Sequence, residues 1–192
     1  AIDFANGMGI WEARALEGLL EWDGLFGDPD GSFPNHEANP LHHATLRDLQ
    51  EKVRGGAYDF GVAFDGDADR AGFVDERGEI IPMDLVTALV AQDVLAARKG
   101  VVLYDLRSSR VVREVIEAAG GKAMMSRVGH AFIKQHMREH GALFAGELSG
   151  HYYFKDNFTA ESSAMAVLAL ANIVSSAEKP LSELIAPLRK YS

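Results

Sequence analysis

Apolar side chains along the chain fall into two alternating patterns. Short apolar runs indicate buried strands, and longer segments with apolar positions three or four residues apart indicate helices. The expected strands are 1–4, 22–26, 59–64, 71–74, 79–81, 101–104, 122–126, 142–145 and 152–154. The expected helices are 10–20, 46–54, 84–97, 110–119, 130–140, 162–176 and 181–188. This alternation of strands with helices predicts an α/β protein whose sheets are mixed and mostly parallel.

The pattern starts again at about the middle of the chain, after Lys99-Gly100. Each half reads strand, helix, strand, helix, strand and then a loop that carries a carboxylate, which is a weak internal repeat. We therefore expect two consecutive α/β domains, at residues 1–98 and 99–192. Because the chain starts inside an apolar run at Ala1 and stops at Ser192 without an obvious closing element, we expect an interior piece of a longer polypeptide.

Composition narrows the classes of protein that fit. The chain has 192 residues, of which 47% are hydrophobic and 24% charged, and its formal net charge is −9. These values are typical of a globular protein, and the acidic balance argues against nucleic acid as a partner. The absence of cysteine excludes disulfides and thiolate metal sites. No signal peptide is visible, and the longest apolar run, Ala164 to Ala171, is too short to span a bilayer, so we expect a cytoplasmic protein without a membrane partner.

The acidic segment 65–70, with the sequence DGDADR, follows a predicted buried strand directly. In an extended strand, alternate carboxylates stand about 7 Å apart, too far to share one cation. Gly66 and Ala68 have almost no side chain, so the backbone can curl and bring the carboxylates together. Three like charges are costly without a counter-ion, and a divalent cation held by oxygens removes that cost. The segment therefore predicts a Mg²⁺ site with positions left for water and a phosphoryl oxygen, and Arg70 can add donors for a phosphate. The predicted ligands are Asp65, Asp67 and Asp69.

A calcium-binding EF-hand is the competing interpretation of the same segment. Asp65, Asp67, Asp69 and Glu76 fall at loop positions 1, 3, 5 and 12 of that motif. An EF-hand also needs glycine at position 6 and a helix on each side. Here position 6 is Arg70 and the flanks read as strands, so the Mg²⁺ site is preferred.

A second polar loop, 146–151 with the sequence GELSGH, places a carboxylate, a hydroxyl and an imidazole at alternate positions. Glu147, Ser149 and His151 can therefore point to one side of a glycine-bounded loop. A carboxylate that accepts from two vicinal hydroxyls is a common way to hold a sugar, and the serine and histidine add hydrogen bonds. Taken alone, the segment is better explained as a polar turn on the surface.

In this order, the two loops resemble those of the α-D-phosphohexomutase superfamily, the phosphomannomutase and phosphoglucomutase enzymes. The metal loop of that family has the form DGDxDR, and its sugar loop has the form GExSGH. Three further segments also match the family: Asp30–His36, Asp105–Arg110 and Val128–His130. The resemblance covers essentially the whole chain and implies the second and third domains of a four-domain enzyme.

The resemblance implies a Mg²⁺-dependent enzyme that moves phosphate between C1 and C6 of a hexose, through a phosphoserine enzyme and a bisphosphate intermediate. It implies that Arg70 and His151 act beside the reacting oxygens, while the aspartates of the DGDADR loop hold the metal. The implied substrate-binding residues are Arg107, Gly129, His130, Glu147, Ser149 and His151. Many family members carry lysine where this chain has Arg107, and the planar guanidinium changes the geometry of phosphate binding.

The family's phosphoserine loop and its C-terminal phosphate-binding loop have no counterpart in the sequence. We therefore expect the isolated chain to be inactive, with the first and fourth domains supplied by the same longer polypeptide. Leu148 differs from the glutamine that we associate with phosphoglucosamine mutases, which favours mannose or glucose phosphate as the substrate.

A zinc hydrolase is the remaining alternative. Residues 136–140 have the form HxxEH, and the two histidines of that pattern share one helix face. No downstream glutamate stands out as a third ligand, so a solvated helix face is the preferred interpretation.

Overall fold

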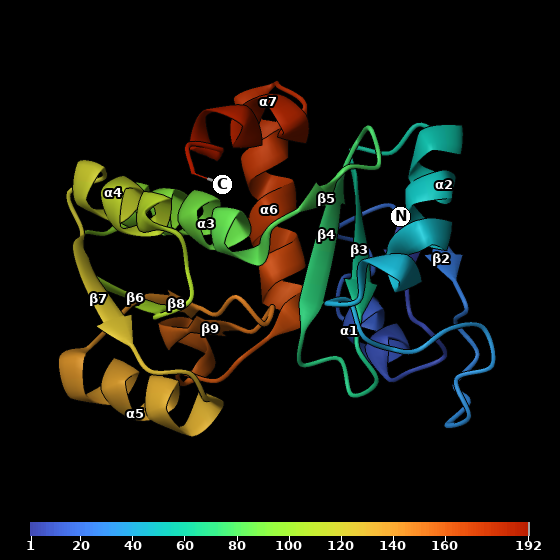
Figure 1. Cartoon of the computed structure of the whole chain (residues 1–192), viewed down its shortest axis with the longest axis horizontal. Coiled ribbons are helices and arrows are strands. Elements are labelled where there is room, and N and C mark those ends of the chain that lie inside the picture. The colour runs from blue at the N-terminus through green and yellow to red at the C-terminus, as the bar shows by residue number, and fades with distance from the viewer. Residues whose placement is uncertain (192) are drawn as a thin grey trace. The chain divides into compact units, whose positions relative to one another are not determined.

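The computed structural model describes residues 1–191, which Figure 1 colours from the N-terminus to the C-terminus. The chain forms two compact units. Unit 1 comprises Ala1–Ile81 and Ser163–Glu183, and unit 2 comprises Pro82–Ser162 and the segment from Leu184 onward. The units are therefore not the simple halves 1–98 and 99–192, because helix α3 (Met83–Ala97) belongs to unit 2 and helix α6 (Ser163–Ala177) belongs to unit 1.

Unit 1 is built on a five-stranded mixed sheet with the strand order β2-β1-β3-β4-β5. The first three of these are parallel to one another, and β4 and β5 are antiparallel to their neighbours. The strands are β1 (Ile2–Asp3), β2 (Gly24–Leu25), β3 (Phe60–Phe64), β4 (Ala71–Asp75) and β5 (Ile80–Ile81). Since the parallel strands run in one direction, their carboxyl ends lie at one edge of the sheet, and β3 leads from that edge into residues 65–70.

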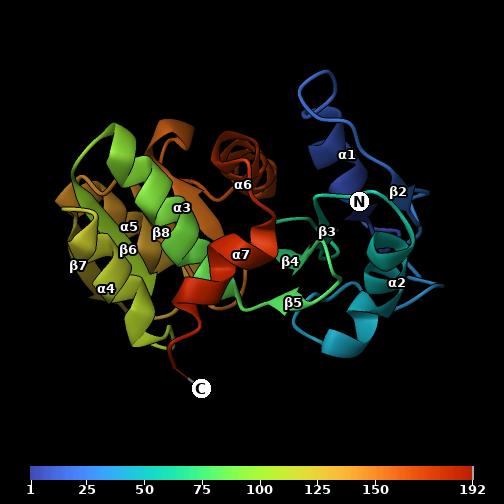
Figure 2. The same ribbon diagram turned by 90° about the horizontal axis from the view of Figure 1, so that it is seen from above.

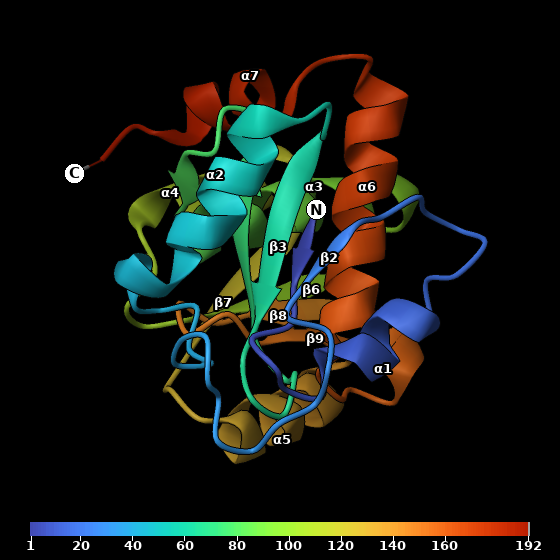
Figure 3. The same cartoon turned by 90° about the vertical axis from the view of Figure 1, so that its right-hand side faces the viewer.

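Helices cover both faces of this sheet. They are α1 (Gly9–Arg14), α2 (Arg47–Gly55) and α6, with a 3-10 turn at His43–Leu46 before α2. Figures 2 and 3 show α2 on one face and α1 with α6 on the other. On the α2 face, Leu49 and Val53 pack with Ala63 and Val74 in one buried cluster. The apolar spacing of α2 therefore serves the core of unit 1, as a one-sided helix requires.

Unit 2 is built on a four-stranded sheet with the order β7-β6-β8-β9, in which the first three strands are parallel and β9 is antiparallel. The strands are β6 (Val101–Asp105), β7 (Lys122–Ser126), β8 (Phe144–Gly146) and β9 (Tyr152–Phe154). The helices are α3, α4 (Arg110–Ala118) and α5 (His130–His140), with a 3-10 turn at Lys155–Asn157. A short helix, α7 (Leu181–Ile185), and a 3-10 turn at Ala186–Leu188 follow α6.

Figure 1 shows α3 and α4 on one face of this sheet and α5 on the other. On the α5 face, Leu103, Ala145 and Tyr153 form a buried cluster with Ile133 and Met137 of the helix. On the opposite face the backbone of β8 approaches α3 so closely that a Cβ atom on Gly146 would stand 2.1 Å from the Thr87 hydroxyl oxygen. Helix packing therefore requires glycine at position 146, which ends β8 and is also the first residue of the candidate sugar loop.

The first four strands of unit 1 and the four strands of unit 2 are arranged in the same order. In each sheet, the strand that comes first in the chain lies between the second and the third, and the fourth returns antiparallel to the third. This order confirms the internal repeat and the expected α/β class. It also means that the DGDADR loop after β3 and the GELSGH loop after β8 occupy equivalent positions in their own sheets.

The predicted end of the first helix is wrong, because helix α1 ends at Arg14, well before residue 20. The hydroxyl of Thr45, just before α2, donates to the carbonyls of Asn39 and His42. The carboxylate of Asp84, in the first turn of α3, accepts from the backbone amide of Ser109 at 2.8 Å, a tertiary contact within unit 2. Within residues 1–191, no helix combines the length and the apolar character needed to cross a membrane.

Candidate active site

The loop between β3 and β4 gathers three carboxylates. One oxygen from each of Asp65, Asp67 and Asp69 lies within 4.8 Å of the other two. The backbone curls at Ala68, which takes a left-handed conformation with φ of +63°, and the amide of Ala68 donates to the Asp65 carbonyl at 3.2 Å. The curl that brings alternate side chains together is therefore present, with alanine rather than glycine at the left-handed position.

Asp65 is the buried member of this cluster, and Asp67 is exposed. Burial raises the pKa of the Asp65 carboxyl, because the charged form loses its solvation. Arg70 opposes that effect: its Nε donates to Asp65 Oδ2 at 2.6 Å, and its backbone amide donates to Oδ1 at 3.1 Å. The same Nε lies 3.7 Å from Asp69 Oδ1. One cationic side chain thus faces a cluster of three acids, and hard oxygen donors with an excess of negative charge fit a divalent cation such as Mg²⁺.

The turn after β1 packs against the backbone of the DGDADR loop. The amide of Met8 donates to the Gly66 carbonyl at 3.0 Å. A Cβ atom on Gly7 would stand 2.8 Å from the same Gly66 oxygen and 3.2 Å from the Asp65 carbonyl oxygen. The two loops therefore pack backbone to backbone, and only glycine at position 7 permits this approach.

The EF-hand interpretation is not supported. The acidic loop is flanked by β3 and β4 rather than by helices. Glu76, which would be the twelfth ligand of an EF-hand, lies outside the carboxylate cluster and accepts from the amide and the hydroxyl of Ser182. These observations leave Asp65, Asp67 and Asp69 as a compact cluster on a β-hairpin loop.

The GELSGH loop closes on itself between β8 and β9. The amide of Glu147 donates to the carbonyl of His151 at 3.0 Å, and the amide of Gly150 donates to the carbonyl of Glu147 at 3.0 Å. Gly150 takes a φ of +90°, which a residue with a side chain rarely adopts. Ser149 Oγ and His151 Nδ1 lie 2.9 Å apart, so the hydroxyl and the imidazole are brought together as the alternation predicts.

Glu147 lies deeper than its position in a polar loop suggests, with only 1% of its surface exposed. Its Oε1 accepts from the amide of Gly129 at 2.9 Å, and its Oε2 accepts from the hydroxyl of Tyr153 at 2.6 Å. His151 Nδ1 lies 3.5 Å from Oε2. The structure therefore brings Gly129, Glu147, Ser149 and His151 into one constellation in unit 2.

His130 is the predicted site residue that follows Gly129 in the chain. Its side chain is 64% exposed, and its Nδ1 lies 3.8 Å from Glu161 Oε1. The other oxygen of Glu161 lies 2.5 Å from Lys134 Nζ. Neither Lys134 nor Glu161 carries a motif in the sequence, so this ion pair near the start of α5 was not predicted.

Arg107 folds back onto the last residue of β6. Its Nε and Nη2 donate to Asp105 Oδ2 at 3.0 and 2.5 Å, and 38% of its side chain is exposed. Asp105 is fully buried and also accepts from the amide of Leu148 at 3.0 Å. Asp105 thus connects the loop after β6 to the GELSGH loop. No role was predicted for Asp105, although an aspartate at the carboxyl end of a buried strand is the sequence signal that points to it.

The zinc hydrolase interpretation is not supported either. His136 Nδ1 lies 2.9 Å from the hydroxyl oxygen of Ser126, and the rings of His136 and His140 are 6.3 Å apart between centroids. Among residues 1–191, the aspartates of the DGDADR loop are the one group of three or more side chains placed to share a metal ion. The histidines of α5 therefore lack a third ligand in the described part of the chain.

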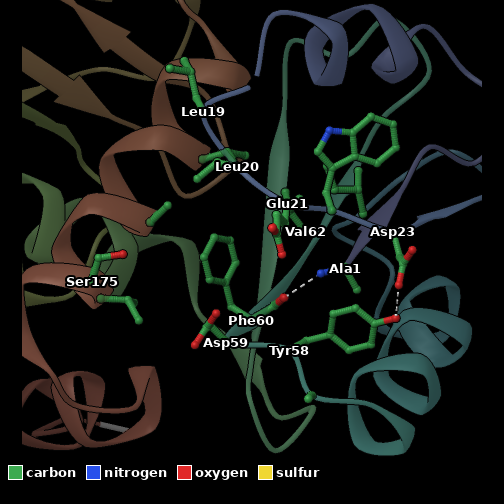
Figure 4. Close-up of a pocket in the computed structure, with 16 residues that line it drawn as sticks. Ala1, Leu19, Leu20, Glu21, Asp23, Tyr58, Asp59, Phe60, Val62 and Ser175 are labelled. Carbon is green, nitrogen blue, oxygen red and sulfur yellow. Dashed lines mark hydrogen bonds between the residues drawn. The ribbon is translucent and has the colours of Figure 1, made fainter. Parts of the chain in front are cut away.

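A cavity of about 480 Å³ lies elsewhere in unit 1, at the amino ends of β1, β2 and β3 (Figure 4). Ala1, Asp23 and Phe60 line it where those strands begin. Ligands of open α/β sheets bind beyond the carboxyl ends of the strands. The carboxylate cluster occupies that edge, so the cavity lies at the other end of the same strands.

Comparison with known proteins decides the family. Residues 1–78 match the family model of phosphoglucomutase/phosphomannomutase alpha/beta/alpha domain II, and residues 82–191 match that of alpha/beta/alpha domain III. This chain belongs to the phosphoglucomutase/phosphomannomutase family. The matched ranges meet near residue 80, before helix α3, where the chain first passes from unit 1 to unit 2. The domain III match also includes residues 163–183, which lie in unit 1.

Individual relatives agree with this assignment. The chain is 42% identical to a phosphomannomutase of Methanocaldococcus jannaschii, over 100% of the chain and 43% of that relative. It is 42% identical to a phosphoglucomutase of Neisseria meningitidis, over 94% of the chain and 40% of that relative. A solved phosphoglucomutase/phosphomannomutase family protein from Burkholderia thailandensis superposes with a TM-score of 0.93 at 34% identity, over 100% of this chain and 42% of the other. The chain therefore spans about two fifths of the length of the relatives it matches.

Proposed function

We propose that this chain supplies the metal-binding and sugar-binding domains of a phosphohexomutase that interconverts hexose 1-phosphate and hexose 6-phosphate. The observation that carries the proposal is the cluster of Asp65, Asp67 and Asp69 beside Arg70, in a chain that belongs to the phosphoglucomutase/phosphomannomutase family. Relatives named phosphomannomutase and phosphoglucomutase support mannose or glucose phosphate as the substrate. The family resemblance further implies a phosphoserine enzyme and a bisphosphate intermediate.

In this proposal the three aspartates of the DGDADR loop hold Mg²⁺. When bound, the ion would neutralise negative charge on a phosphoryl oxygen. Arg70 keeps its guanidinium beside Asp65 and Asp69, where it can turn its remaining N–H donors to phosphate oxygens. The catalytic role of Arg70 is therefore to stabilise charge on the transferring group.

Substrate recognition is assigned to unit 2. The Glu147 carboxylate accepts hydrogen bonds from sugar hydroxyls, and the Ser149 hydroxyl can donate to them or accept from them. Gly129 and His130 contribute from the start of α5. His151 is held against Ser149 and can move a proton at its other ring nitrogen, Nε2. Arg107 is partly exposed and supplies a planar fork of donors for phosphate.

The whole protein is proposed to contain two further domains, one with the phosphoserine and one that binds phosphate. The relatives are more than twice as long as this chain, which is consistent with such a protein. The assignment of metal binding to residues 1–98 and of sugar binding to residues 99–192 stays a prediction, as does a cytoplasmic location.

The proposal is tested by assaying the full-length polypeptide that contains this chain with mannose 1-phosphate and glucose 1-phosphate. We expect formation of the 6-phosphate with Mg²⁺ present, loss of turnover in EDTA, and no turnover by the 192-residue chain alone. Absence of mutase activity in the full-length, Mg²⁺-loaded protein would refute the proposed function. Calorimetric titration of the chain with Mg²⁺ and with Ca²⁺ separately tests the choice of metal.

A further inference from the structure

Tyr153 lies in the core of unit 2, and its hydroxyl reaches the GELSGH loop. The side chain is fully buried and belongs to the cluster packed under α5. Its hydroxyl donates to Glu147 Oε2 at 2.6 Å. Its ring is stacked beside that of His151, with centroids 6.1 Å apart and planes inclined by 29°. One side chain therefore contacts two residues that the proposed function assigns to the substrate.

The hydrogen bond matters because Glu147 is buried. A carboxylate removed from water needs donors on its oxygens, and each oxygen of Glu147 has one: the Gly129 amide on Oε1 and the Tyr153 hydroxyl on Oε2. A carboxylate can accept about four hydrogen bonds, so these two leave capacity for a pair of sugar hydroxyls. Two donors from different parts of the chain, Gly129 just before α5 and Tyr153 in β9, also fix the plane of the carboxylate.

We infer that Tyr153 is a positioning residue for sugar recognition, whose hydroxyl holds the Glu147 carboxylate in the orientation that accepts from the hexose. The inference rests on the proposed function, since it deepens the role given there to Glu147. It assigns the Tyr153 ring to packing and the Tyr153 hydroxyl to recognition, two contributions that one substitution can separate.

Tyr153→Phe keeps the ring in the core and removes only the hydroxyl. In the full-length enzyme we expect KM for the hexose phosphate to rise about tenfold, the effect of losing one hydrogen bond to a charged group, while kcat changes less than about twofold. Activation by Mg²⁺ is expected to stay unchanged, because the metal ligands lie on another loop. A KM equal to that of the parent enzyme would overturn the inference.

Tyr152→Phe is the matched control. Tyr152 is also buried and is the neighbour of Tyr153 in β9, so its side chain points to the opposite face of the sheet. The same chemical change there is expected to leave KM unchanged. An equal rise in KM in both variants would indicate a general loosening of β9 and would also overturn the inference.

A double-mutant cycle with Glu147→Gln separates positioning from a structural effect. If Tyr153 acts through the Glu147 carboxylate, Tyr153→Phe raises KM much less in the Glu147→Gln background than in the parent. If Tyr153→Phe raised KM by the same factor in both backgrounds, the inference would be contradicted. These outcomes differ from a failure of the proposed function, in which the parent enzyme itself would not interconvert hexose phosphates.

Discussion

At the scale of the residue, Asp65 and Glu147 occupy equivalent positions in the two sheets and have different partners. Each is the first residue after the third strand of its sheet, and each is 1% exposed. Asp65 faces the guanidinium of Arg70, whereas Glu147 faces a backbone amide and the hydroxyl of Tyr153. The charged surroundings of Asp65 are therefore compatible with binding metal and phosphate, and the neutral donors around Glu147 are compatible with binding a sugar.

Asp67→Asn tests the metal assignment. Asp67 is the exposed one of the three proposed ligands, so replacing its carboxylate by an amide removes negative charge from the cluster with little effect on the core. We expect mutase activity of the full-length enzyme to fall at least about a hundredfold, as for a lost contact to the transferring group. Magnesium titrations should show weakened binding.

Asp93→Asn is the control for that variant, because it makes the same change on the exposed surface of helix α3. We expect its Mg²⁺ affinity and activity to match those of the parent. Normal turnover by Asp67→Asn at ordinary Mg²⁺ concentrations would contradict the metal assignment.

Glu147→Ala tests the sugar loop at the same scale. The substitution leaves the Gly129 amide and the buried Tyr153 hydroxyl without their acceptor, and it removes the proposed acceptor for the sugar. We expect KM for hexose phosphate to rise more than kcat falls, with Mg²⁺ affinity unchanged. Steady-state kinetics with calorimetric Mg²⁺ titration would check this, and a variant that lost metal binding while retaining its KM would argue against the assignment.

At the scale of the element, the loops depend on the turns packed behind them. The turn after β1 touches the backbone of the DGDADR loop through Gly7 and Met8. Asp105, at the end of β6, accepts from the amide of Leu148 in the GELSGH loop. In both units, residues at or just after the end of the first strand therefore form hydrogen bonds with the loop after the third strand.

Gly7→Ala tests this support. The added methyl would stand 2.8 Å from the Gly66 oxygen, closer than real side chains approach a backbone atom. We expect the free energy of unfolding to fall by about 1–3 kcal/mol, as for other overpacked sites, together with weaker Mg²⁺ binding. Gly31→Ala is the control, since a Cβ atom there meets nothing within 4 Å. Chemical denaturation of both variants would measure the difference in the free energy of unfolding. If Gly7→Ala unfolded at the parent's denaturant midpoint, the turn would not stabilise the loop.

At the scale of the whole molecule, we expect the acidic cluster to make the stability of the fold depend on pH and on bound metal. Burial raises the pKa of Asp65, so the folded chain binds that proton more tightly than the unfolded chain. The contribution of Asp65 to stability is therefore present at low pH and is lost as the pH rises through its pKa in the folded state. In the proposed function Mg²⁺ binds the ionised carboxylates, so we expect metal binding to oppose this loss.

We therefore expect Mg²⁺ to raise the free energy of unfolding of unit 1 by about 2.7 kcal/mol at a hundred times its Kd near neutral pH. The gain should shrink as the pH is lowered, since protons compete for the same carboxylates, and EDTA should abolish it. Thermal unfolding with and without Mg²⁺ at several pH values would measure the effect. A gain that stayed constant down to pH 4 would contradict binding by these aspartates.

The sequence by itself determined the class of fold, the order of strands and helices, and the two chemistry-bearing loops. These follow from local properties: apolar periodicity, glycine positions and the motifs DGDADR and GELSGH.

Only the tertiary structure decided which unit α3 and α6 join, because both helices are rich in apolar residues around most of their circumference and no single polar face orients them. It also decided that Asp84 binds the Ser109 amide, that Asp105 holds Leu148 and that Tyr153 holds Glu147. The choice of partner for a buried polar group depends on which residues the fold brings near it, and sequence spacing carries no such information.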